Sequence, residues 1–315
     1  MMRPMGLPAL SVIVVSDYNS ADERTWNDER SCLSALAAQD LTEPFEVIVS
    51  EDEKYRTTFP DELLTIVPGT RVIFCANSTS YGLKNSGARE AEAPIVVLLD
   101  ADCTPDSAWL RLIVETMRDN PDVATVSGRT FYEGRSLDTR VLALLTRSYL
   151  DPGVRGETPF VSNNAGAFRR EIFLRYPLPE SMGAFSSRIQ SEAMKRDGCI
   201  LWFEPRMRVV HEFEGWGMEA DIRRNIGYGT IATRLSKPQM PHASLIRMGI
   251  LATPVVAAGK LLNTWGDCLR CASAYGVRWF ELPVAMGAAV VVNLLEIPGM
   301  LAAYRHGSIQ DTAYR

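Results

Sequence analysis

The segment that decides the fold is Ile95–Pro105, which has the sequence IVVLLDADCTP. Five apolar residues, Ile95 to Leu99, lead directly into two carboxylates separated by one small residue, Asp100 and Asp102. A short β-branched run bounded by polar residues is typical of a strand buried on both faces. We therefore expect both carboxylates at the edge of a sheet, where hard oxygen ligands suit Mg²⁺ or Mn²⁺. A solvated turn after a strand is the alternative.

Acidic residues also follow two earlier apolar runs. Leu10–Val15 is followed by Asp17, and Phe45–Val49 is followed by Glu51 and Asp52. The carboxyl ends of parallel strands meet at one edge of a sheet, so these acids are expected to converge with the first pair. Carboxylates brought together repel one another unless a cation or hydrogen-bond donors lie between them. The pattern therefore favours a cation-dependent site.

Apolar runs alternate with helical periodicity through the first half of the chain. The pattern predicts strands over 10–15, 45–49, 71–75, 95–99 and 123–126, and helices over 27–38, 79–91 and 105–118. Pro105 suits the first turn of the last helix. This alternation predicts an α/β fold with a mostly parallel sheet, right-handed crossovers and flanking helices.

Charge is unevenly distributed along the 315 residues. The net charge of -5 disfavours a nucleic-acid partner. Residues 237–315 hold seven Lys or Arg and four Asp or Glu, a net +3, which leaves -8 for residues 1–236. Pro238 and Pro241 interrupt the chain between these parts. We expect a catalytic domain over 1–236 and an apolar helical tail over 237–315 that associates with anionic lipid.

Cysteine and histidine usage argues against zinc. Cys268 and Cys271 form the only C-x-x-C among six cysteines, and the chain has three histidines. Zinc would need two more well-spaced ligands, so free thiols in a reducing compartment are expected. The first ten residues, MMRPMGLPAL, lack the apolar core of an export signal. The chemistry is therefore expected on the cytoplasmic side.

Two apolar segments of the tail raise the question of a membrane. Met248–Gly259 has 12 uncharged residues, fewer than the ~20 that span a bilayer. Leu282–Tyr304 has 23 residues but contains Glu296, whose insertion costs about 3 kcal/mol. Three arrangements stay open: a hairpin of two spans, two half-inserted amphipathic helices, or a helical pair packed on the body or on a second subunit. The first two imply a membrane-proximal or lipid-linked substrate.

The usual glycine-rich phosphate loops are absent from the sequence. It contains no G-x-x-x-x-G-K-[ST] loop, and Gly227 and Gly229 lie in a segment with helical character rather than after a strand. A phosphate-containing ligand would therefore be held by a metal and by cations such as Lys84.

Four segments together, in their order and spacing, match one known pattern. VIVVSDYNS (12–20) and FEVIVSEDE (45–53) have the form of a first and second strand, each with its acidic end. YGLKNSGAREAEAPIVVLLDADC (81–103) has a helix leading into D-x-D, and FVSNNAGAFRREIF (160–173) ends in Phe-Arg-Arg. Over roughly residues 8–235 the chain resembles the family 2 glycosyltransferases, which have the GT-A nucleotide-diphospho-sugar fold.

The resemblance implies inverting transfer of a hexose from a nucleotide diphosphate to an acceptor hydroxyl, assisted by Mg²⁺ or Mn²⁺. Asp102 is implied to be the main metal ligand and to act in catalysis, with Asp100 as a second ligand. His211 resembles a further metal ligand of some relatives, and a hydrogen-bonded structural imidazole is the alternative. Substrate contacts are implied for Asp17, Asn19, Glu51, Asp52, Lys84, Asn85, Asp100, Asn164 and Arg169.

The resemblance and the tail together suggest the cellular setting. The acceptor is expected to be a glycan or a lipid-linked molecule at the cytoplasmic face of a bacterial inner membrane, in the synthesis of cell-envelope polysaccharide. Ser16 and Lys84 depart from the family pattern, which has proline and arginine at these positions.

The general base is the largest departure from the family pattern. An inverting enzyme needs a base that removes the proton of the acceptor hydroxyl. The family supplies it as Glu-Asp at the start of a helix, where this chain has Ser186 and Ser187. Glu180 and Glu192 are the nearest carboxylates. We hypothesise that Glu192, within the helix predicted over 187–196, is the base.

Three other functions fit parts of the sequence. Haloacid-dehalogenase-like phosphatases also have D-x-D-x-T after an apolar run, but on their first strand. A nucleotidyltransferase would have a glycine-rich loop after its first strand, and residues 16–24 contain no glycine. A non-enzymatic membrane scaffold that keeps a decayed transferase fold would account for the missing Glu-Asp pair.

Overall fold

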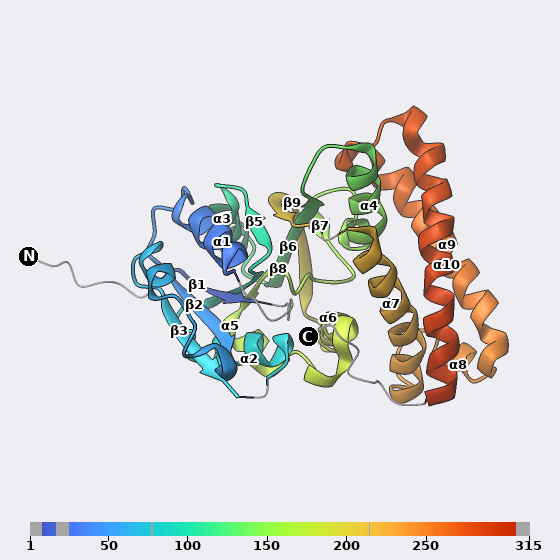
Figure 1. Ribbon diagram of the computed structural model, residues 1–315, viewed down its shortest axis with the longest axis horizontal. Coiled ribbons are helices and arrows are strands. Elements are labelled where there is room, and N and C mark those ends of the chain that lie inside the picture. Colours follow the sequence, from blue (N-terminus) through green and yellow to red (C-terminus); the bar gives the residue numbers. More distant parts are fainter. Residues whose placement is uncertain (1–7, 17–24, 77, 214, 307–315) are drawn as a thin grey trace, which may run out of the picture.

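The computed structural model describes residues 8–16, 25–76, 78–213 and 215–306, and Figure 1 shows its elements. The strands are β1 (Leu10–Val15), β2 (Phe45–Asp52), β3 (Arg71–Cys75), β4 (Ile95–Asp100), β5 (Cys103–Pro105), β6 (Val123–Tyr132), β7 (Gly156–Glu157), β8 (Ala165–Arg169) and β9 (Ile200–His211). The α-helices are α1 (Asn27–Ala37), α2 (Ser80–Glu90), α3 (Trp109–Asp119), α4 (Leu137–Arg147), α5 (Arg170–Arg175), α6 (Ser186–Arg196), α7 (Trp216–Ser236), α8 (Ala243–Ile246), α9 (Thr253–Cys271) and α10 (Leu282–His306).

The described strands form one sheet in the order β3-β2-β1-β4-β8-β6-β9-β5, with β7 paired to β9. β3, β2, β1 and β4 are mutually parallel, and β6 is parallel to β9. β8 runs antiparallel to β4 and β6, and β5 and β7 run antiparallel to β9. The predicted α/β fold is confirmed, and the antiparallel strands make its sheet mixed.

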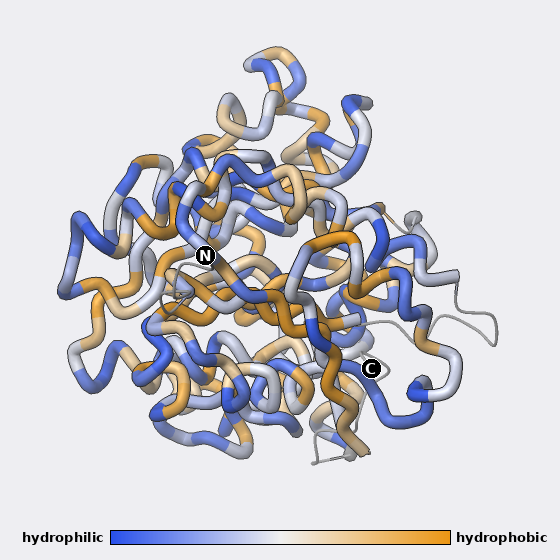
Figure 2. Tube along the Cα trace, turned by 90° about the vertical axis from the view of Figure 1, so that its left-hand side faces the viewer, coloured by the Kyte–Doolittle hydropathy of each residue, from blue (hydrophilic) through white to orange (hydrophobic). Residues whose placement is uncertain are grey.

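Each face of the sheet is covered by helices. Side chains alternate along β1, so Val12 and Val14 pack in the cluster that includes residues of α1 and α3. Ile13 and Val15 pack in a second cluster, with residues of α2, α5 and α6. In Figure 2 the hydrophobic segments run through the middle of the body, and hydrophilic residues mark its outer turns. The core therefore lies on both faces of the sheet, as expected for strands buried on both sides.

Some predicted boundaries are confirmed and others are wrong. β1 and β3 have the predicted bounds, whereas β6 continues to Tyr132 instead of ending at Val126. Pro105 does not begin a helix. It is the last residue of β5 and pairs with Val209 of β9, and α3 begins four residues later. The short strand β5 forms because the segment after Asp102 finds an antiparallel partner in β9, which local sequence does not encode.

The tail packs as helices beside the body. α10 lies against α7 and α9, and Figure 1 shows the three side by side. Among the described residues, one helix is long and apolar enough to cross a membrane, Trp279–Arg305. Of its most apolar stretch of 18 residues, 39% is buried inside the protein. The segment around Met248–Gly259 is divided, because α9 begins only at Thr253.

Glu296 is buried between helices rather than exposed to an apolar surface. Its carboxylate lies 3.4 Å from Arg223 of α7 and forms a close ion pair with Lys260 of α9. Arg223 also pairs with Glu219, one turn earlier on α7, at 2.6 Å. The charge of Glu296, which would be costly in a membrane span, is therefore compensated by cations on both neighbouring helices, α7 and α9.

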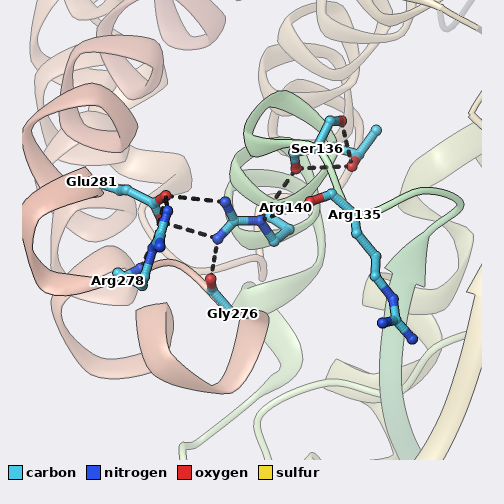
Figure 3. Close-up of polar contacts among 7 residues, drawn as sticks. Arg135, Ser136, Arg140, Gly276, Arg278 and Glu281 are labelled. Carbon is cyan, nitrogen blue, oxygen red and sulfur yellow. Dashed lines mark hydrogen bonds and ion pairs between the residues drawn. The ribbon is translucent and has the colours of Figure 1, made fainter.

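A second polar contact attaches the start of α10 to the body (Figure 3). The guanidinium of Arg140 on α4 donates to both oxygens of Glu281, at 2.9 and 3.1 Å, and to the carbonyl of Gly276. Arg278 also donates to Glu281, at 2.6 Å. This contact fixes the tail on α4, whose other end lies close to the site described below.

Candidate metal centre

Asp100 ends β4 in a buried ion pair. Its carboxylate lies 2.7 Å from Nζ of Lys84 on α2, and each side chain is 1% exposed. The backbone N–H of Asp100 donates to the carbonyl of Asn164 at 2.9 Å, and the N–H of Ala101 donates to Val15 at 2.9 Å. The charge of Lys84, which we expected to contact phosphate, therefore serves first to compensate Asp100. The turn that carries Asp102 is fixed from both sides.

Glu51 and Asp52 end β2 on the same edge of the sheet. Glu51 is buried and accepts hydrogen bonds from the hydroxyl of Ser16 at 2.7 Å and from the N–H of Asp52 at 2.8 Å. Asp52 is half-buried and accepts from the N–H of Lys54 at 2.9 Å. The two carboxylates thus differ in exposure. Glu51 is buried and links Ser16 to the backbone of Asp52, whereas Asp52 is partly exposed at the edge of the sheet. Asp17 and Asn19 lie outside the described residues.

Asp102 and His211 are brought together by β5 and β9. Cys103 pairs with His211 in the antiparallel ladder, and the N–H of Glu212 donates to the carbonyl of Asp102 at 3.0 Å. These contacts place Oδ2 of Asp102 3.1 Å from Nε2 of His211, with both side chains buried. Residues more than 100 positions apart in sequence therefore meet beside the end of β4.

The hydrogen bond of the other ring nitrogen fixes the tautomer of His211. Nδ1 lies 2.7 Å from the carbonyl oxygen of Glu212, which can only accept, so Nδ1 carries a proton. Burial lowers the pKa of His211, and the nearby Asp102 carboxylate only partly opposes this shift. Because the pKa lies below its usual value near 6.5, the ring is neutral at pH 7. Nε2 then presents a lone pair to a carboxylate oxygen. Two acceptors face each other at 3.1 Å, which favours a cation between them.

The donor set fits a divalent metal ion. Oδ2 of Asp102 is buried and accepts no hydrogen bond from the described residues. Ligand atoms of Asp102, Cys103 and His211 all lie within 4.8 Å of one another. Burial, reinforced by Asp102 and Asp100, raises the pKa of the Cys103 thiol, which points to Oδ1 of Asp102 at 3.5 Å. The thiol is therefore protonated and donates a hydrogen bond to the Asp102 carboxylate. Oδ2 of Asp102 and Nε2 of His211 remain as ligand atoms, and this combination suits Mn²⁺.

Sequence reasoning missed two further carboxylates beside this pair. Asp28, at the start of α1, has a pKa raised to about 6, first by burial and then by Glu212, Glu29 and Asp102. An acid in the first turn of a helix is usually explained by the helix dipole, so its position in the sequence gave no signal of a shared site. The structure adds Asp28 and Glu212 to the negative potential around Asp102.

Three predicted site residues have other structural roles. Asn85 exchanges hydrogen bonds with the backbone of Leu178, at 2.9 and 3.0 Å, and so ties α2 to a following segment. Arg169 pairs in register with Ile95, at the opposite end of β4 from Asp100. Its guanidinium donates to the carbonyls of Val123, Met117 and Asn120. The structure does not bring Arg169 to the metal centre. Asn164 contributes its backbone carbonyl, described above, to the turn after β4.

The region of the expected general base contains no carboxylate at the start of α6. Ser186 donates its hydroxyl to the carbonyl of Pro179 at 2.6 Å, and Ser187 is buried. Glu192 lies further along α6 and forms an ion pair with Lys195 at 3.1 Å. Its role as a base stays a prediction.

A solved structure of a mannosyltransferase shares the fold of this chain. The chain is similar to a mannosyltransferase, PcManGT from Pyrobaculum calidifontis in complex with GDP-Man and Mn²⁺, with 18% identity and a TM-score of 0.58. The match covers 95% of this chain and 88% of that one. GalNAc-T7 with UDP, GalNAc and Mn²⁺ matches at 14% identity and a TM-score of 0.48, over 74% of this chain and 52% of the other. No curated protein matches the chain significantly.

Sequence profiles give the family directly. Residues 11–176, more than half of the chain, match the family described as glycosyl transferase family 2. The matched region begins at the second residue of β1 and extends through β8 and α5, and it includes Asp100, Asp102 and Arg169. The chain belongs to glycosyl transferase family 2 and is a glycosyltransferase.

Proposed function

We propose that the chain transfers a sugar, with inversion, from a nucleotide diphosphate donor to an acceptor at a membrane, using Mn²⁺ or Mg²⁺ held by Asp102 and His211. The observation that carries the proposal is the buried contact of two acceptor atoms, Oδ2 of Asp102 and Nε2 of His211, at 3.1 Å. The similar fold of PcManGT, whose structure contains GDP-Man and Mn²⁺, supports it.

Each residue at the edge has a distinct task in this proposal. The Lys84–Asp100 pair and the carbonyl of Asn164 hold the turn that aims Asp102. Asp52, at the surface end of β2, accepts hydrogen bonds from the donor's base or ribose. When bound, the metal supplies positive charge that stabilises the diphosphate leaving group.

The tail is proposed to contact the membrane through an exposed apolar face. Val255, Leu262 and Leu269 are exposed at seven-residue intervals along α9, and Val284 and Val291 are exposed at the same interval along α10. A seven-residue interval keeps side chains on one face of a helix. Soluble monomers rarely expose apolar patches of this kind, and the net +3 of residues 237–315 suits anionic lipid. Such a tail would place the enzyme at the cytoplasmic face of a bacterial inner membrane.

Thermal unfolding tests donor and metal binding. With Mn²⁺ present, the correct nucleotide sugar in a screen is expected to raise the melting temperature, and neither component alone should raise it as much. Asp102→Asn should abolish the joint effect. Glu43→Gln, which removes a surface carboxylate paired with Arg118, should keep it. A screen without any Mn²⁺-dependent stabilisation would favour the scaffold alternative instead.

Flotation with lipid vesicles tests the membrane face. The wild-type chain is expected to float with vesicles that contain phosphatidylglycerol, and a Leu262→Glu, Val291→Glu double variant should stay at the bottom. Glu43→Gln again serves as the control. Equal flotation of the double variant would show that this face does not contact lipid.

A further inference from the structure

The outer side of α10 is apolar over nearly its whole length. Along Leu282–Tyr304, all of which the structure describes, every exposed residue is apolar, whereas Asn293 and Glu296 are buried. A surface helix of a soluble protein has the opposite arrangement, with its polar residues outward. The exposed side chains recur at intervals of four or seven residues, which keeps them on one face of the helix. They include Phe280, Val284, Val291 and Leu295.

α9 has the same inverted arrangement. Its Leu262 and Leu269 are exposed, whereas Lys260 and Thr264 contact α10. Lys260 pairs with Glu296, and Oγ1 of Thr264 accepts a hydrogen bond from Nδ2 of Asn293 at 3.4 Å. The polar groups of the two helices therefore bond to each other beneath an apolar outer surface, as in helices that pack in contact with lipid.

The inner side of α10 is covered by the body of the protein. The first half of α10 packs on α4, with Ala285 and Ala289 in the same apolar cluster as Leu142. The second half packs on α7, where a Cβ atom at Gly299 would lie 1.8 Å from the carbonyl oxygen of Arg224. Figure 1 shows α10 running alongside α4 and α7. α10 therefore cannot enter a membrane lengthwise unless α4 and α7 enter with it.

An exposed ion pair on α7 argues against such an insertion. Asp221 and Arg224 pair at 2.9 Å, and their side chains are 65% and 60% exposed. The backbone of Arg224 lies against Gly299, so this pair is level with the second half of α10. A bilayer that surrounded α10 would surround these two charges as well, and charged side chains in the hydrocarbon region are costly.

The exposed charge around the two helices has one sign. Residues 243–305 are all described, and within them the exposed charged residues are all arginines, while both glutamates are buried. These arginines are Arg247, Arg270, Arg278 and Arg305. Between α9 and α10, Trp279 and Phe280 are also exposed. Basic and aromatic residues at the ends of an apolar face are typical of the boundary between lipid headgroups and acyl chains.

We infer that α9 and α10 lie flat in one leaflet of an anionic bilayer, and that α10 does not cross it. The inference rests on the membrane contact in the proposed function and gives its geometry. The apolar face enters the boundary between headgroups and acyl chains to a depth of about 5–10 Å. The arginines at the helix ends contact anionic headgroups. α4 and α7 stay on the aqueous side with the catalytic domain.

Quenching by brominated lipids measures depth along α10. Bimane is attached to Val284→Cys, Val291→Cys or Leu295→Cys, and each labelled chain is bound to phosphatidylglycerol vesicles with bromine near the headgroup or near the bilayer centre. For a flat helix we expect shallow bromine to quench all three labels more strongly than deep bromine, with ratios that agree within about twofold. In a span, Leu295 would lie about 16 Å further along the helix than Val284 and close to the centre. Stronger quenching of Leu295→Cys by deep bromine would overturn the inference.

Two controls accompany this measurement. Ser107→Cys labels an exposed position before α3, and neither bromine should quench it. The unsubstituted chain, labelled in parallel, gives the background from the half-buried Cys75 and Cys199. A blue shift of the Val291→Cys label that grows with protein concentration in the absence of vesicles would assign the face to a second copy of the chain and overturn the inference.

Charge variants test whether the surface is anionic. Arg247→Gln should bind phosphatidylglycerol vesicles about fivefold more weakly than the wild-type chain, the effect of one basic residue at an anionic surface. Binding to neutral phosphatidylcholine vesicles should not change. Arg196→Gln, which removes an exposed cation on α6, is the matched control and should bind both like the wild-type chain. Unchanged binding of Arg247→Gln to phosphatidylglycerol would overturn the assignment of an anionic surface.

Flotation separates this inference from the proposed function. A wild-type chain that floats with vesicles but shows a graded depth along α10 would overturn the flat arrangement and leave the membrane contact standing. A wild-type chain that does not float would overturn both. The Mn²⁺-dependent stabilisation by a nucleotide sugar needs no vesicles, so it tests the proposed transfer independently of either result.

Discussion

Two buried carboxylates, Asp102 beside the sheet and Glu296 in the tail, have opposite surroundings. Glu296 lies against two cations, Arg223 at 3.4 Å and Lys260 closer still. Asp102 lies 3.1 Å from the lone pair of a neutral His211, with Asp28 and Glu212 nearby. Cations of the neighbouring helices compensate Glu296, whereas Oδ2 of Asp102 accepts no hydrogen bond from the described residues. Burial of a charge therefore indicates a ligand only where the surrounding groups fail to neutralise it.

The same contrast holds among cations. Arg223 is buried and paired with Glu219 and Glu296, and it joins helices. Arg188 stacks on Phe160 and forms no ion pair within the described part of the chain. The matched charges hold the fold together, and the unmatched Asp102 marks the proposed metal site. The predictions below test this division, beginning with the largest effect.

Removing the charge of Glu296, the carboxylate that is paired with cations, should mainly change the stability of the protein. Glu296→Gln leaves Arg223 and Lys260 without their shared anion, and removal of one partner of a buried pair costs about 3–5 kcal/mol. Chemical denaturation should show this loss of unfolding free energy, whereas Mn²⁺ binding by the remaining folded protein should be unchanged. A loss below about 1 kcal/mol would mean that the pair is solvated, as surface pairs are.

Removing the charge of Asp102, the carboxylate beside His211, should mainly change the transferase activity. Asp102→Asn removes a proposed metal ligand, and even residues that only orient such ligands alter affinity or activity 10–100-fold. We therefore expect the transfer rate to fall about 100-fold or more. Without metal, the unfolding free energy should stay equal or rise, because the repulsion between Asp102 and His211 is removed. A marked loss of stability in the metal-free protein would assign Asp102 a structural role.

The packing of α10 on α7 offers a test that involves no charge. A Cβ atom at Gly227 would lie 1.9 Å from the carbonyl oxygen of Glu296, so the two backbones could not keep their distance. Gly227→Ala should cost about 1–3 kcal/mol of stability through overpacking. Gly217→Ala, on the same helix with open space around it, is the control. Equal stability of both variants would contradict this close contact.

The smallest effect is expected at Asp28. Its pKa is about 6 in the folded protein, above the value near 3.9 of an unfolded aspartate. The folded state therefore binds the extra proton, and this contribution to stability is present below about pH 4 and lost as the pH rises through about 6. Asp28→Asn should stabilise the metal-free protein above about pH 6, by less than about 1 kcal/mol because the side chain is solvent-screened.

Urea titrations at about pH 4 and pH 7.5 check this pH dependence. Asp122→Asn, which changes an exposed aspartate far from this site in sequence, is the charge control. An equal gain for Asp28→Asn at both pH values would exclude titration as its cause.

Local patterns predicted much of the sheet. Leu10–Val15 and Arg71–Cys75 have the predicted bounds, since runs of β-branched and apolar residues between turn formers identify buried strands. The prediction at Pro105 was wrong, because β5 exists only through its pairing with β9. Arg169 was expected to contact substrate from its place in a motif. The antiparallel register of β8 places it at the far end of β4 from Asp100, and its contact with substrate stays a prediction.

The sequence by itself determined the family, the order of the main strands and the carboxylates at their ends, because these follow from short-range patterns. Only the tertiary structure decided which charges are matched. Lys84 meets Asp100, and Lys260 meets Glu296, while Asp102 meets a neutral imidazole. These partners come from distant segments, and the free energy of a buried charge depends on what lies within a few ångströms of it, which spacing along the chain does not specify.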